Sequence, residues 1–115
     1  MTNKSVTLWL TLVVYCIFQP AWAEEAADVV WIDVRTPAEY ASGHVPQAIL
    51  IPFDGIEAGV AQRQLSKDTP IYLYCAAGGR AEKAKERLEA LGYTEVTNVG
   101  GLKDAEKLAG AAVVQ

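Results

Sequence analysis

Short apolar segments rich in β-branched residues alternate with helical segments along this chain, and only a few residues join one segment to the next. Strands are predicted at residues 29–34, 48–51, 71–74 and 96–99. A short helix is predicted to begin at Thr36-Pro37, and longer helices are predicted at 56–65, 80–91 and 102–108. Such alternation indicates a parallel sheet covered by helices on both faces. The sequence therefore predicts a small α/β domain whose ligands bind beyond the carboxyl ends of its strands.

The composition excludes several classes of protein. The 115 residues allow one domain, and a formal net charge of −4 lacks the broad basic character of a nucleic-acid binder. Two cysteines and one histidine cannot supply a four-ligand cysteine/histidine zinc site. The chain also has no glycine-rich phosphate loop followed by Lys and Ser or Thr.

The first 23 residues have the pattern of a cleavable signal peptide. Lys4 precedes a run of thirteen uncharged, mostly apolar residues at 6–18, and Ala21 and Ala23 provide the small residues that signal peptidase requires. A membrane anchor is the alternative, but the run is short against the ~20 residues that cross a bilayer. We predict a signal peptide at 1–23 and a single domain at 24–115 that is exported to the periplasm and keeps no membrane anchor.

Cleavage after Ala23 would remove Cys16 and leave Cys75 as the only cysteine. A single cysteine excludes a disulfide within the mature chain and an oxidoreductase of the Cys-x-x-Cys type. An unpaired cysteine in an exported protein is a candidate reactive thiol, and a buried small apolar residue is the alternative.

The surroundings of Cys75 favour a reactive thiol. Cys75 directly follows a predicted strand, and a loop of four small residues (76–79) separates it from a helix that begins at Arg80. Backbone N–H groups of such a loop can form a nest for an anion, and the N-terminus of the helix adds positive charge. A thiolate in this position has a lowered pKa, and the Arg80 guanidinium can bind an oxyanion.

Simpler roles are predicted for four other polar residues. Arg35 and Glu39 lie four residues apart at a helix entrance, so we expect an ion pair between them. His44 is expected to make a structural hydrogen bond rather than to transfer a proton. Asp33 ends a buried strand, where its carboxylate could accept hydrogen bonds that brace the cysteine loop.

Three motifs in this order resemble the rhodanese (thiosulfate sulfurtransferase) family. They are Asp33-Val34-Arg35 with Glu39-Tyr40 and Gly43-His44-Val45-Pro46, then Cys75 to Arg80, then a turn at Gly100-Gly101. The resemblance covers residues 29–104 and is strongest to the short, exported bacterial members. It implies an α/β fold with a parallel sheet of about five strands, flanked by helices on both faces.

The same resemblance implies a function. Cys75 would be the catalytic nucleophile, taking the outer sulfur of thiosulfate as a persulfide. It would pass that sulfur to a small thiophilic acceptor, such as cyanide in an assay, or to a thiol in the cell, including that of a thiol-bearing protein. No cofactor or metal would be needed, and the protein would act as a monomer. Substrate binding would fall to Arg80, Ala76, Ala77, Gly78 and Gly79.

Two other functions stay open at this point. A sulfur-carrier or binding module would need the same persulfide on Cys75 but no turnover. A cysteine phosphatase also places a cysteine loop before a helix that carries an arginine, but that loop is longer than the four residues between Cys75 and Arg80. The smaller ring suits a sulfur atom better than a phosphate. Whether Arg80 binds the anion or pairs with a carboxylate such as Asp33 to hold the loop is also open.

Overall fold

The architecture is a four-stranded parallel sheet in the order β2-β1-β3-β4, seen in a computed structural model that describes residues 28–115. The predicted signal peptide therefore lies outside the described residues. In chain order the elements are β1 (Val30–Asp33), α2 (Pro37–Ala41), β2 (Ala48–Leu50), the 3₁₀ helix η1 (Phe53–Gly55), α3 (Ile56–Gln62), β3 (Ile71–Cys75), α4 (Gly79–Ala90), β4 (Val96–Gly101) and α5 (Leu102–Ala109).

The predicted fold class is confirmed, with one difference in strand number. Each of the four segments predicted from their β-branched, apolar residues forms a strand. The expected fifth strand, which came from the family resemblance alone, is not found within residues 28–115. The helix predicted over 56–65 ends earlier, at Gln62, and the chain turns at Gln64, whose backbone is left-handed (φ 56°).

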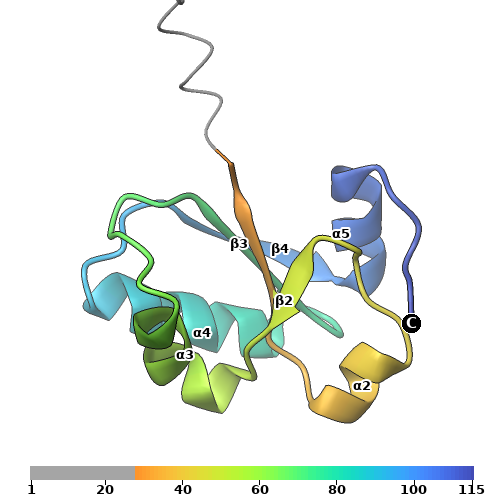
Figure 1. Ribbon diagram of the computed structural model, residues 1–115, viewed down its shortest axis with the longest axis horizontal. Coiled ribbons are helices and arrows are strands. Elements are labelled where there is room, and N and C mark those ends of the chain that lie inside the picture. The colour runs from red at the N-terminus through yellow and green to blue at the C-terminus, as the bar shows by residue number, and fades with distance from the viewer. Residues whose placement is uncertain (1–27) are drawn as a thin grey trace, which may run out of the picture.

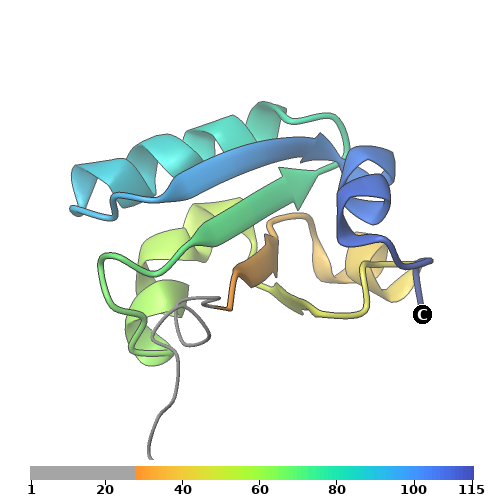
Figure 2. The ribbon, with the colours of Figure 1, turned by 90° about the horizontal axis from the view of Figure 1, so that it is seen from above.

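Helices cover the sheet on both faces, and each face has its own buried core. On one face α3 and α4 pack against the sheet (Figures 1 and 2), and the buried side chains there include Ile32, Leu73 and Leu88. On the other face α5 packs against Trp31 and Tyr74. Burial of these apolar surfaces is the main favourable term in the stability of the domain. It also holds the carboxyl ends of β1, β3 and β4 in fixed positions.

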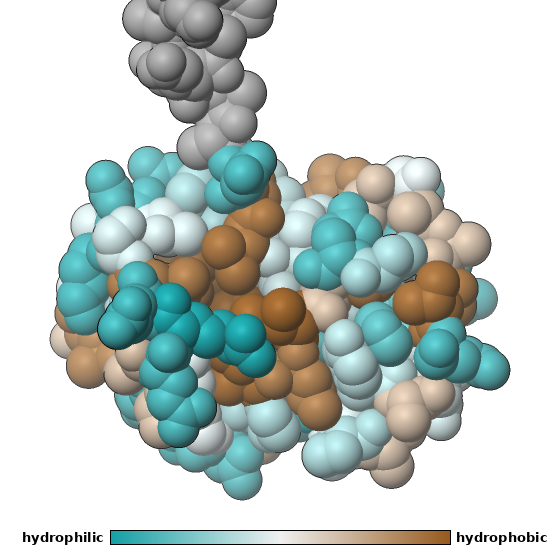
Figure 3. Space-filling model, in the orientation of Figure 1, coloured by the Kyte–Doolittle hydropathy of each residue, from teal (hydrophilic) through white to brown (hydrophobic). Residues whose placement is uncertain are grey.

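The strand β2 forms one edge of the sheet and is only three residues long. Apolar surface in the middle of the face shown in Figure 3 lies over β2 and the start of β1, where Val29, Val30, Ile49 and Leu50 are half-buried. A short edge strand offers few free backbone groups to another chain. Among the helices of residues 28–115, none combines the length and the apolar character that crossing a bilayer requires.

The predicted turn at Gly100-Gly101 is wrong, because both glycines belong to β4. Their partners on β3 are Tyr74 and Cys75, after a register shift that leaves Val99 without a partner. Gly100 has a left-handed backbone (φ 111°), which favours glycine. Pairing therefore continues beyond the irregularity to the last residue of each strand, and the carboxyl ends of the two strands lie side by side (Figure 2).

Candidate active site

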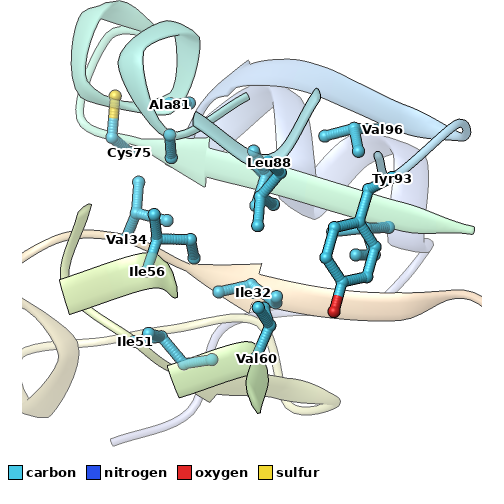
Figure 4. Close-up of a cluster of buried hydrophobic side chains, with 13 residues drawn as sticks. Ile32, Val34, Ile51, Ile56, Val60, Cys75, Ala81, Leu88, Tyr93 and Val96 are labelled. Carbon is cyan, nitrogen blue, oxygen red and sulfur yellow. The ribbon is translucent and has the colours of Figure 1, made fainter. Parts of the chain in front are cut away.

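Cys75 is the last residue of β3, at the carboxyl end of a strand in the middle of the sheet. Its side chain is buried, and Figure 4 shows its sulfur pointing away from the other labelled side chains of the core. The carboxyl ends of parallel strands are where α/β sheets bind their ligands. The sulfur is therefore held by the core but faces the end of the sheet where a site is expected.

The loop after Cys75 wraps around the sulfur. The N–H of Gly78 donates a hydrogen bond to Cys75 Sγ over 2.9 Å. Gly78 caps the N-terminus of α4 with a left-handed backbone (φ 106°), a conformation that a residue with a side chain rarely adopts. The sequence Gly78-Gly79 thus permits a tight turn between β3 and α4 that aims backbone N–H groups inward.

Backbone donors control the ionisation of Cys75. Burial of the thiol raises its pKa, but hydrogen bonds from the backbone N–H groups of Ala81, Ala77, Gly78 and Arg80 outweigh burial and leave the pKa below its ordinary value. Arg80 and Ala81 lie in the first turn of α4 and Gly78 is its N-cap, so three of these donors are at the positive end of the helix dipole. Residues near the sulfur can thus stabilise a thiolate or another anion bound there.

The structure places the predicted site residues unequally. Gly78 donates its backbone N–H to the sulfur over 2.9 Å. The backbone N–H groups of Ala77 and Arg80 also lower the pKa of Cys75, whereas Ala76 and Gly79 are not among the groups that lower it. The N–H of Ala81 lowers this pKa as well and was not predicted to do so. The sequence did contain a signal for this role. Ala81 lies in the first turn of a helix that begins beside the cysteine, and the first N–H groups of a helix have no partners within the helix.

Arg80 is held by Glu39 through two parallel hydrogen bonds. Its two terminal nitrogens lie 2.8 and 3.0 Å from the carboxylate oxygens of Glu39. These bonds raise the pKa of Arg80, and the charges of Glu39 and Cys75 act in the same direction. The side chains of Arg80 and Glu39 are 30% and 34% exposed, so the pair borders solvent.

Glu39 has a second role at the start of α2. It accepts a hydrogen bond from the Thr36 N–H, and the Glu39 N–H donates to the Thr36 hydroxyl, which completes the predicted capping box. The pKa of Glu39 is lowered to about 2, mostly by the hydrogen bonds from Arg80 and to a smaller extent by those from Thr36. The carboxylate therefore stays charged at all ordinary pH values and links α2 to the cysteine loop.

The predicted ion pair between Arg35 and Glu39 is wrong. Arg35 pairs with Asp33, with nitrogen–oxygen distances of 2.7 to 3.1 Å, and also donates to the carbonyl of Gly43. Both members of this pair are buried, and a buried guanidinium needs a carboxylate within hydrogen-bond distance, which Asp33 provides. Asp33 is thus occupied by Arg35 rather than by the cysteine loop, and it is not the carboxylate that holds Arg80.

His44 makes the structural hydrogen bond that was predicted. Its Nδ1 lies 2.8 Å from the carbonyl oxygen of Tyr40, and its ring stacks on the Tyr40 ring with 3.5 Å between centroids. The backbone of His44 also pairs with Val114 in both directions, which fastens the C-terminal segment beside α2 (Figure 1). These contacts give His44 a role in the packing of the chain around α2.

The end of β4 supports the cysteine loop from the side opposite α2. A β-carbon on Gly101 would overlap the carbonyl oxygen of Ala76, so the two backbones are in direct contact. The side chain of Asn98 donates to the carbonyl oxygen of Gly78 over 3.1 Å. Neither contact followed from the sequence, because both join the loop to a strand about twenty residues later in the chain.

Gly101→Ala is expected to destabilise the protein by about 1–3 kcal/mol, the usual cost of forcing extra volume into a packed site. The added methyl group would meet a backbone carbonyl, which can move only with the cysteine loop. Urea unfolding measures the change. Gly55→Ala is the matched control, because a β-carbon there meets no atom within 4 Å, and we expect a change within about 0.5 kcal/mol. Equal stability of the two variants would contradict the close contact.

Known proteins are similar to this chain in sequence and in fold. Residues 19–107 match the family described as rhodanese-like domain. The chain is 45% identical over 74 residues to thiosulfate sulfurtransferase PspE of Escherichia coli K12, covering 64% of this chain and 71% of that protein. It is 35% identical to a sulfurtransferase of Allochromatium vinosum, over 67% and 70% of the two chains. A solved structure, "rhodanese with anions from E. coli", aligns with a TM-score of 0.64 and 43% identity, over 67% of this chain and 91% of that one.

Proposed function

Because the chain belongs to the rhodanese-like domain family, we propose that it is a thiosulfate sulfurtransferase that carries sulfur as a persulfide on Cys75. Two relatives that align over about seven tenths of their length are named sulfurtransferases, and this supports sulfurtransferase activity. The observation that carries the residue assignment is the ring of backbone N–H groups around a buried sulfur at the carboxyl end of β3.

In the first half-reaction, the Cys75 thiolate attacks the outer sulfur of thiosulfate. A new sulfur–sulfur bond forms, the bond between the two sulfurs of thiosulfate breaks, and sulfite leaves with that electron pair. The product is a persulfide whose terminal sulfur carries the negative charge. Backbone N–H groups from the loop and the start of α4 would stabilise this charge, and Arg80 would bind the oxygens of thiosulfate before sulfite leaves.

In the second half-reaction, a thiophilic acceptor attacks the terminal sulfur and the Cys75 thiolate leaves. Cyanide would yield thiocyanate in an assay, and a thiol would yield a new persulfide in the cell. No charge on residues 76–79 would repel or select an acceptor, because these residues are alanine and glycine. Such an uncharged loop is compatible with small acceptors and with the thiol of a partner protein.

The experiment that tests this proposal is the intact mass of the purified protein before and after thiosulfate. We expect a gain of one sulfur atom, which cyanide then removes. A sulfur-carrier module would show the same mass gain, so steady-state turnover with thiosulfate and cyanide distinguishes the two functions. A protein that never gains sulfur from thiosulfate would contradict the proposed donor.

We further propose that residues 1–23 direct export to the periplasm and are then removed. The exported protein is expected to begin at Glu24, because Ala21 and Ala23 are the small residues suitably placed after the apolar run. N-terminal sequencing of periplasmic material provides the measurement. Membrane-bound protein that still begins at Met1 would show that the apolar run serves as an anchor.

A further inference from the structure

We propose that Asn98 is a positioning residue for Cys75, whose side-chain amide ties the loop to β4 and so holds the Gly78 N–H against the sulfur. This inference rests on the proposed function only in taking Cys75 as the reacting group. Asn98 lies in the middle of β4, three residues before the end of the strand. It does not touch the sulfur and acts through Gly78.

The amide of Asn98 makes three hydrogen bonds to three different segments. Its Nδ2 donates to the Gly78 carbonyl oxygen over 3.1 Å and to Glu82 Oε1 over 3.0 Å. Its Oδ1 accepts from the N–H of Gly100 over 3.0 Å. Both N–H groups and the carbonyl oxygen of this half-buried side chain therefore have partners. One amide thus joins the irregular end of β4 to the loop and to the first turn of α4.

The contact with Gly78 is the one that bears on the chemistry. Gly78 has a positive φ of 106°, and glycine is the residue with the greatest backbone freedom. Its N–H is the donor 2.9 Å from Cys75 Sγ, and its carbonyl oxygen accepts from Asn98 and from the Glu82 N–H. Rotation of the Gly78 backbone would turn the N–H away from the sulfur, and the two donors on its carbonyl oppose that rotation.

The β4 side of this contact is also fixed. A β-carbon on Gly78 would lie 3.5 Å from Gly100 Cα, so the loop rests directly on the irregular segment of β4. The bond from the Gly100 N–H holds the Asn98 amide in the orientation that presents Nδ2 to the loop. Asparagine is a poor strand former, so its place here is explained by these contacts rather than by strand propensity.

The test is the pH dependence of Cys75 alkylation by iodoacetamide in the native protein and in Asn98→Ala. We expect the apparent pKa of the thiol to rise by about 0.3–1 pH unit in the variant, the change that follows when one backbone N–H bond to the thiolate weakens without being lost. At a pH well below the pKa, the alkylation rate should fall about two- to tenfold, and the two rates should converge at high pH. Thr97→Ala, which changes an exposed neighbour on the same strand, is the matched control and should leave the profile unchanged.

Asn98→Ala adds and removes no charged group near the loop, but it also removes the hydrogen bond to Glu82. Glu82→Gln, measured alone and together with Asn98→Ala, shows whether the Glu82 charge contributes to the rise. The charged side chains in the first turns of the helices and at the strand end around the loop include Arg80 and Glu82 on α4, Glu39 on α2, Asp33 and Arg35 at the end of β1, and Asp104 on α5. Thermal melts show whether the variant is folded. A folded Asn98→Ala with the native alkylation profile would overturn the proposal.

If Asn98→Ala does not fold, Asn98→Asp provides the measurement. Aspartate keeps the shape of the side chain and the acceptor for Gly100 but cannot donate to Gly78. High ionic strength screens the added charge at this half-exposed position. An alkylation profile unchanged under those conditions would also overturn the proposal. Because alkylation needs no sulfur donor, failure of the protein to take sulfur from thiosulfate would leave this result intact, and the two proposals can fail separately.

Discussion

Cys75→Ser is expected to abolish both sulfur uptake from thiosulfate and turnover with cyanide. Serine nearly preserves the size of the side chain, so the buried position and the loop should be kept. A hydroxyl stays protonated at neutral pH, whereas the N–H groups around Cys75 lower the pKa of the thiol despite its burial. Native activity should accordingly decline as the pH falls through a value below about 8.5, the ordinary pKa of cysteine.

Intact mass after incubation with thiosulfate and steady-state kinetics with cyanide provide the two readouts. Cys16→Ser in the full chain is the matched control, because it makes the same change at the other cysteine of the sequence and should leave both readouts unchanged. Ping-pong kinetics are expected for the native protein, since sulfite leaves before the acceptor reacts. Turnover that survives in Cys75→Ser would remove the persulfide from the proposed reaction.

Features determined by neighbouring residues could be predicted from the sequence. The four strands followed from short runs of apolar and β-branched residues, and the capping box at Thr36 and Glu39 followed from their spacing. The nest around Cys75 was also predictable, because a strand, two small residues, two glycines and a helix leave few paths for the chain. In each case the deciding interactions lie within a few residues of one another.

Contacts between distant segments could not be predicted in the same way. Arg80 and Glu39 are 41 residues apart in the chain, and only the folded sheet places α2 beside the cysteine loop. Spacing alone favoured a bond between Glu39 and Arg35, but burial of Arg35 beside Asp33 decided otherwise. The glycines of β4 were likewise predicted to form a turn. They belong to a strand because of their partners on β3 and on the loop, and these partners are distant in the chain.

Arg80→Ala is expected to lower kcat/KM for thiosulfate by about ten- to more than one hundredfold. Residues 76–79 have no charge, so Arg80 is the one charged side chain of the loop available to thiosulfate. A charge-assisted hydrogen bond to an anion contributes about 1.5–3 kcal/mol, which corresponds to that range. The loss should fall mainly on KM if Arg80 binds thiosulfate and the transition state equally. Arg80→Lys should recover part of it, because the charge remains but the planar, two-pronged donor does not.

Glu39→Gln distinguishes two roles of Arg80, binding of the anion and bracing of the loop. The bracing role depends on the two hydrogen bonds from Arg80 to the Glu39 carboxylate, which this variant weakens. Glutamine keeps an acceptor for Thr36 in the capping box but removes the charge that faces Arg80. If Arg80 binds the anion, Glu39→Gln should keep kcat/KM within a few-fold of the native value. This half-buried pair borders solvent and contributes at most about 1 kcal/mol, so Arg80→Ala should melt close to the native protein. Two outcomes would contradict anion binding by Arg80. One is a loss of activity in Glu39→Gln as large as that in Arg80→Ala, and the other is a much lower melting temperature of Arg80→Ala with an unchanged KM. In either case the guanidinium braces the loop, and the backbone N–H groups alone bind thiosulfate.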